Sequence, residues 1–175
     1  MKKLELNFKG VLQSWGSYGG GLNYHPTDTK PTESGILGMI AAGMGIDRSE
    51  EAKLQELRDS IEIDIPEPEE FPDIYHDFQV VSPQGTSFTD YLSDSQMLPE
   101  DLRALPAASG AASTTGETKT INKDYILNQD YTVFIRGSEE VLDKVKHALQ
   151  HPYYPIFLGR KCCTASTMKV CEVAA

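Results

Sequence analysis

Apolar and polar residues alternate along several short segments of the chain, and this pattern predicts strands. Residues 4–8 and 61–65 alternate strictly, with the period of two expected of a half-buried strand. Residues 74–81, 131–135 and 154–158 are rich in aromatic and β-branched side chains, which is typical of strands. We therefore predict five strands, the last of them closing the sheet.

Three segments between these strands have the periodicity and end signals of helices. They cover residues 31–46, 49–60 and 138–150, and the last opens on Ser138, a residue type that caps helix N-termini. Counting the main elements, the order is β-α-β-β-α-β. This order predicts an α+β, ferredoxin-like fold, in which helices pack on one face of an antiparallel sheet.

The helix predicted over 31–46 contains three glycines, at positions 35, 38 and 43. Each glycine costs roughly 1 kcal/mol relative to alanine in a helix interior. Three of them indicate that something approaches the helix backbone closely, either a packed sheet or a bound phosphate. Thr32 or Ser34 can cap the helix start, and Gly45 marks its end.

Two further segments favour contact with phosphate groups. A glycine-rich loop, residues 15–21, precedes the glycine helix, and backbone N–H groups at such a helix start bind anions. The loop does not have the lysine and hydroxyl spacing of a P-loop. Near the C-terminus, Gly159 is followed by the cations Arg160 and Lys161, which could meet a phosphate backbone.

Residues 82–120 differ in composition from the rest, being dominated by Ser, Thr, Gly, Ala and Pro. We predict an insertion here, which is mobile unless a partner orders it. Residues 1–165 would then form one domain that carries this insertion, and residues 166–175 a short C-terminal strand or tail. A chain of 175 residues is too short for two full domains.

The formal net charge of −10 is concentrated in one stretch. Residues 50–77 hold eleven acidic residues against Lys53 and Arg58, so the rest of the chain is close to neutral. This acidic block predicts a solvated face that keeps one side of the protein away from nucleic acid. No apolar run reaches the roughly 18 residues of a membrane span, and the strand-like start indicates no signal peptide. We expect a cytoplasmic protein without membrane contact.

Three cysteines lie close to the C-terminus, at positions 162, 163 and 171. An odd number in a chain without an export signal argues against a disulfide framework. Adjacent Cys162 and Cys163 lack the spacing of a zinc site. The sequence thus predicts reduced, partly buried thiols, with no metal and no cofactor.

Six short segments together resemble the CasD family, the RAMP subunits of the type I CRISPR surveillance complex Cascade, most like those of type I-E. The resemblance extends from residue 4 to about residue 165, with the segments in the family's order and spacing. They are residues 12–16, 31–38, 41–46, 77–79, 124–127, and 148–149 leading to 158–163.

The resemblance implies a non-catalytic subunit that binds the 5′ handle of the CRISPR RNA. It also implies a ferredoxin-like domain with the 82–120 insertion as a thumb. The thumb would pack on the backbone subunit, CasC, and a CasA-like large subunit would lie nearby. Target DNA would be contacted only through the complex. Gly38 and Gly43 would let the helix pack tightly on the sheet. The positions that would face RNA through phosphate, sugar and stacking contacts are Gln13, Ser14, Trp15, Gly16, His25, Thr32, Ser34, Gly35, Tyr125, Arg160 and Lys161.

The chain departs from the family pattern at several positions. His25 stands where the family tends to have arginine, and Glu33 lies where it has a basic residue. Cys162 replaces a serine and Thr164 a proline. Relatives also continue for several tens of residues after the motif, where this sequence has only residues 166–175.

Two other hypotheses remain open from the sequence. One is a metal-independent endoribonuclease that cuts CRISPR repeat RNA, as type I-C relatives do, with Tyr24, His25 and Lys30 as the candidate catalytic residues. The other is a scaffold subunit that binds only protein through its acidic face.

Overall fold

The computed structural model describes residues 2–17, 20–21, 23–81 and 119–174. Its main sheet has four strands in the order β4-β7-β1-β8, and all three neighbouring pairs are antiparallel. The strands are β1 (Lys2–Lys9), β4 (Ile61–Asp64), β7 (Asp130–Gly137) and β8 (Thr167–Ala174). The chain is thus mixed α and β with antiparallel sheets.

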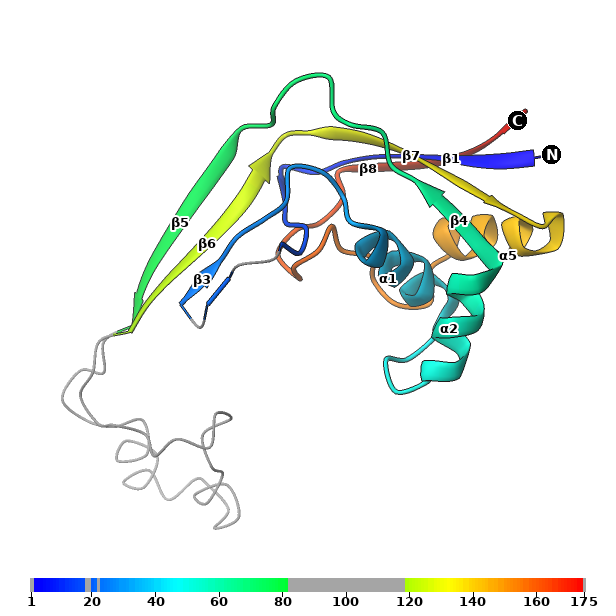
Figure 1. Cartoon of the computed structure of the whole chain (residues 1–175), viewed down its shortest axis with the longest axis horizontal. Coiled ribbons are helices and arrows are strands. Elements are labelled where there is room, and N and C mark those ends of the chain that lie inside the picture. The colour runs from blue at the N-terminus through cyan, green and yellow to red at the C-terminus, as the bar shows by residue number, and fades with distance from the viewer. Residues whose placement is uncertain (1, 18–19, 22, 82–118, 175) are drawn as a thin grey trace, which may run out of the picture. The chain divides into compact units, whose positions relative to one another are not determined.

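The predicted alternation of β1 and β7 divides the sheet into two faces. Leu4, Leu6 and Phe8 on β1 are buried, as are Val133 and Ile135 on β7. Helices α1 (Glu33–Met44) and α5 (Glu139–Gln150) lie on the same side of the sheet (Figure 1). The apolar side chains between these helices and the sheet form most of the core, which continues to Trp15, to Ile126 on β6 and to Leu158.

A second sheet is formed by β2 (Leu12–Gln13), β6 (Lys119–Leu127) and β3 (Tyr24–His25), with β5 (Ile74–Val81) also paired to β6. Residues 74–81 form a strand as predicted, and this strand belongs to the second sheet rather than to the main one. Phe78–Asn122 is a separate compact unit, of which residues 78–81 and 119–122 are described. The rest of the predicted insertion, residues 82–118, lies outside the described residues.

The predicted closing strand over 154–158 is wrong. The backbone N–H groups of Tyr153 and Tyr154 donate to the carbonyls of Gly43 and Ala42, at 3.0 and 3.1 Å. These carbonyls belong to the last turn of α1, where a helix leaves its C=O groups unpaired. The segment thus caps α1, and β8 takes the place beside β1 in the sheet.

Helix ends agree with the sequence signals. Thr32 caps α1 by accepting from the N–H of Gly35, Ser138 caps α5 by accepting from the N–H of Val141, and Gly45 ends α1 in the left-handed conformation with φ of 74°. Among the described helices, none is long and apolar enough to cross a membrane.

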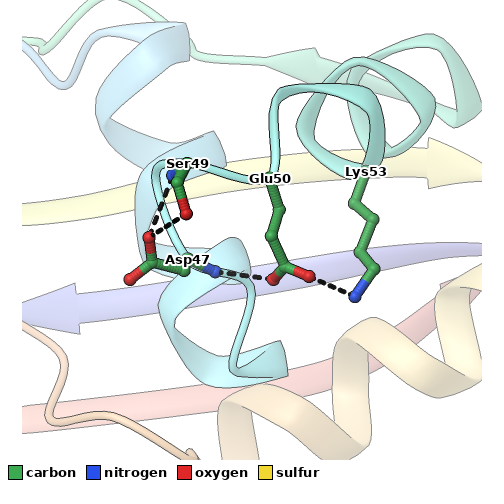
Figure 2. Close-up of polar contacts among 4 residues, drawn as sticks. All are labelled: Asp47, Ser49, Glu50 and Lys53. Carbon is green, nitrogen blue, oxygen red and sulfur yellow. Dashed lines mark hydrogen bonds and ion pairs between the residues drawn. The ribbon is translucent and has the colours of Figure 1, made fainter.

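A polar network fixes the turn before α2 (Glu51–Ser60), as Figure 2 shows. The Asp47 carboxylate accepts from the N–H and hydroxyl of Ser49, at 2.9 and 2.7 Å, and Glu50 accepts from the N–H of Asp47 at 3.0 Å while pairing with Lys53. The bonds from Ser49 lower the pKa of Asp47, and the bond from Lys53 lowers that of Glu50. Their stabilisation is present at neutral pH and is lost as the pH falls through these lowered values.

The three glycines of α1 have different surroundings. A Cβ at Gly43 would lie 2.7 Å from the carbonyl oxygen of Ala148, so this glycine permits close approach of α5. A Cβ at Gly35 would lie 2.9 Å from the Trp15 ring. A Cβ at Gly38 would meet nothing within 4 Å, and the residue is exposed. The expectation that Gly38 packs on the sheet is therefore wrong, and Gly43 packs on a helix.

The contrast between Gly43 and Gly38 gives a matched stability test. Gly43→Ala should destabilise the protein by about 1–3 kcal/mol, because the backbone of α5 must move away. Gly38→Ala should stabilise it by up to about 1 kcal/mol, because alanine has the higher helix propensity and no neighbour is displaced. Urea unfolding followed by circular dichroism measures both. Equal effects of the two substitutions would contradict the packing described here.

Candidate nucleic-acid interface

Two surface pockets lie on either side of the segment formed by Gly16 and Ser17. The first, which we call the Arg160 pocket, has a volume of about 570 Å³, and the second, the α1 pocket, about 440 Å³. The Arg160 pocket is lined by Ser14, Gly16, Ser17, Gly20, Gly21, Tyr24, His25, Pro26, Gly159 and Arg160. The α1 pocket is lined by Gly16, Ser17, Asp28, Thr32, Glu33, Ser34, Leu37 and Arg58.

Asp124, on β6, is a buried carboxylate that connects two other strands at the Arg160 pocket. The Tyr24 hydroxyl on β3 donates to Oδ2 of Asp124 at 2.6 Å, and Nδ1 of His76 on β5 lies 2.7 Å from Oδ1. Burial pushes the pKa of Asp124 upward, but the bonds from Tyr24 and His76 and the charge of Arg160 together outweigh it and lower that pKa. The bond to Asp124 in turn raises the pKa of Tyr24.

His76 presents its ring to solvent while its Nδ1 is held by this carboxylate. Its side chain is 74% exposed, against 8% for Asp124. The Asp124 carboxylate thus orients the imidazole through Nδ1 while most of the side chain stays exposed, an arrangement that suits proton transfer or a contact with an anion. Sequence reasoning missed His76 and Asp124 as site residues, although His76 lies in a predicted strand and Asp124 begins one of the segments that resemble CasD.

Arg160 connects three segments of the chain. Its guanidinium donates to the carbonyls of Asp124 and His25, at 3.0 and 2.7 Å, and lies 4.7 Å from the centre of the Tyr125 ring. Two of its donor nitrogens therefore bind backbone rather than facing outward. Tyr125 is buried under this contact, whereas the neighbouring Lys161 is exposed.

The turn that carries Arg160 is joined to the segment around Ser14. Gly159 has a φ of 97°, and a Cβ there would lie 1.6 Å from the carbonyl oxygen of Ser14, so no side chain fits. The N–H of Ser14 donates to the Leu158 carbonyl at 3.0 Å, and the N–H of Cys163 donates to the Arg160 carbonyl at 2.8 Å. The close contact between these two segments in the pocket wall thus requires glycine at position 159.

Gln13 and Trp15 are core residues in this structure. Gln13 is fully buried, its amide donating to the Gln129 carbonyl at 2.5 Å and accepting from the Trp15 indole at 3.3 Å. Trp15 is 1% exposed and its ring lies 5.7 Å from that of Phe8. Neither side chain can stack on a base without leaving the core, so this segment reaches the surface through Gly16.

The remaining predicted residues divide between the two pockets. Thr32 and Ser34 line the α1 pocket, with their hydroxyl oxygens 3.4 Å apart, while Gly35 is partly buried against Trp15. His25 is exposed in the Arg160 pocket.

The three catalytic candidates from the sequence are not brought together by these contacts. Tyr24 bonds to Asp124, and His25 contributes its carbonyl to Arg160. Lys30 pairs instead with Glu67, in the loop after β4.

The three cysteines are free thiols. Within the described part of the chain, no group of three or more histidine, cysteine or acidic side chains has a geometry suited to a metal ion.

The comparisons with known proteins cover nearly the whole chain. The family model described as CRISPR-associated protein (Cas_Cas5) matches residues 3–175. A relative from Escherichia coli (strain K12), described as CRISPR system Cascade subunit CasD, is 27% identical over 165 residues, which are 91% of this chain and 66% of the relative.

Two solved structures share the fold. One, titled CRISPR RNA-guided surveillance complex, gives a TM-score of 0.63 at 23% identity, and the other, titled crystal structure of Cas protein, gives 0.54 at 21%. Each match covers 94% of this chain but 60% of the solved chain. This chain therefore spans just under two thirds of the length of its relatives. Because the family model matches it almost from end to end, the chain belongs to the CRISPR-associated Cas5 protein family.

Proposed function

We propose that the chain is a non-catalytic subunit of a Cascade surveillance complex and that it binds the 5′ handle of the CRISPR RNA. Membership of the Cas5 family is the observation that carries this proposal, supported by the similarity to a Cascade CasD subunit. In the complex, the handle would be held beside the backbone and large subunits, with the 82–120 insertion as the contact to the backbone subunit.

We further propose that the main sheet is the ferredoxin-like sheet of a RAMP domain. In chain order, β1, α1 and β4 form one strand-helix-strand unit, and β7, α5 and β8 form another. β7 lies between β1 and β4, so the first unit is split by a strand of the second. This split arrangement is the ferredoxin-like pattern.

The Arg160 pocket is the proposed site for the handle. Its rim contains Gly16, Gly20 and Gly21, all exposed, where backbone can approach a phosphate closely. His25 and Tyr24 add exposed rings at the same pocket, and Lys161 adds an exposed charge next to Arg160. Single-stranded RNA is recognised by this combination of cationic and aromatic groups.

The Arg160 pocket can be tested by the salt dependence of RNA binding. Lys161→Ala should weaken binding of handle RNA and reduce the slope of log affinity against log salt by about 0.7, as expected for the loss of one phosphate contact to a single strand. Lys169→Ala, which removes an exposed charge from β8, should leave both unchanged. Filter binding at several salt concentrations measures the slopes. Equal losses in the two variants would indicate only a general charge effect.

A second candidate function, a metal-independent endoribonuclease, is favoured by one observation. The Asp124 carboxylate holds both His76 and Tyr24, and the exposed ring of His76 could act as a general base toward an RNA 2′-OH. In this second proposal, the general base is His76 rather than His25 or Lys30.

RNA cleavage in EDTA distinguishes the two functions. For the binding role, we expect repeat RNA to remain intact with the native chain. Site-specific cleavage that is lost in His76→Gln and retained in His25→Ala would instead establish the nuclease. Gel analysis of end-labelled repeat RNA reads out both results, with circular dichroism confirming that each variant is folded.

A further inference from the structure

The adjacent cysteines Cys162 and Cys163 form a dithiol with one accessible and one buried sulfur. Their Sγ atoms lie 3.9 Å apart. Cys162 is exposed, with its thiol 3.7 Å from the Tyr125 hydroxyl, whereas Cys163 is completely buried. The third cysteine, Cys171, is also exposed, but it lies in β8, paired opposite Glu5.

We propose that Cys162 and Cys163 are a thiol-modification site that reacts with low-molecular-weight disulfides and closes to a reversible disulfide between the two neighbours. The Cys162 thiolate attacks one sulfur of the reagent, forms a mixed disulfide and releases one thiolate. The Cys163 thiolate then attacks the Cys162 sulfur and releases the second. Two protein thiols are oxidised by two electrons, and the reagent is reduced to two thiols, whose protons come from the two cysteines through solvent.

The different environments of the two sulfurs set the order of these steps. The accessible sulfur must react first, since reagents in solution cannot reach Cys163. Burial also raises the pKa of Cys163 to about 12, which keeps its thiol protonated and unreactive toward reagents. The second step is intramolecular, and proximity of the two sulfurs offsets the small thiolate fraction.

The product would be easily reduced. Neighbouring Cα atoms are about 3.8 Å apart across a trans peptide, below the usual range of about 4.4–6.8 Å for disulfides. A disulfide closed over one peptide bond is therefore strained, and strained disulfides are the reducible ones. This property fits a reversible modification rather than a structural bridge.

The proposal is tested by incubating the intact chain with oxidised glutathione and then digesting it with trypsin. Cleavage after Lys161 and Lys169 puts the dithiol and Cys171 on separate peptides, so their modification can be read independently. After incubation, acid quenching and digestion without reductant, the 162–169 peptide should lose two hydrogens and carry no glutathione. The 170–175 peptide should carry one glutathione on Cys171, which has no neighbouring thiol and serves as the internal control.

Two variants check the roles of the sulfurs. Cys163→Ser should retain one glutathione on Cys162, and Cys162→Ser should leave the 162–169 peptide unmodified while Cys171 still reacts. A stable glutathione adduct on that peptide in the native chain would overturn the proposal, as would modification of Cys163 in folded Cys162→Ser protein. If Cys163→Ser does not fold, the peptide masses of the native chain decide the question.

Discussion

The fixed contact between the turn at Gly159 and the segment at Ser14 is the constraint on which the candidate site depends. It leaves no space for a Cβ at position 159, and it places Arg160 where its guanidinium reaches the carbonyls of His25 and Asp124. Segments far apart in sequence are thereby connected, namely the segment at Ser14, β3, β6 and the C-terminal turn. Without this connection, the pocket rim would be a set of independent loops, each losing conformational entropy on binding.

In this region, the burial of individual charged groups matters more than the net charge of the chain. The chain carries a formal charge of −10, yet Asp124, which contacts Tyr24 and Arg160 of the pocket, is buried and its carboxylate is bonded to Tyr24 and His76. A buried carboxylate with such partners organises its neighbours, whereas an exposed one would repel RNA. The exposed cation Lys161 and the open backbone of Gly16 are therefore compatible with an acidic protein.

Sequence reasoning succeeded where a local signal decides the structure. Thr32, Ser138 and Gly45 act as the predicted helix ends, and the alternation around Leu6 produces a half-buried strand. It failed where long-range contacts decide. Residues 154–158 have strand composition but cap α1, and the exposed Gly38 cannot be told from the packed Gly43 by sequence alone. The pairing of His76 with Asp124 joins residues 48 positions apart, which no local spacing reveals.

Arg160 shows how one side chain can hold the wall of a surface pocket together through contacts with the protein's own backbone. A lysine could not replace it, because one ammonium group cannot span the two carbonyls and also lie over the Tyr125 ring, as the guanidinium does. The requirement for arginine at this position thus comes from the architecture of this chain. Lys161, whose side chain is exposed, makes none of these contacts, so a substitution there would leave the wall of the pocket in place.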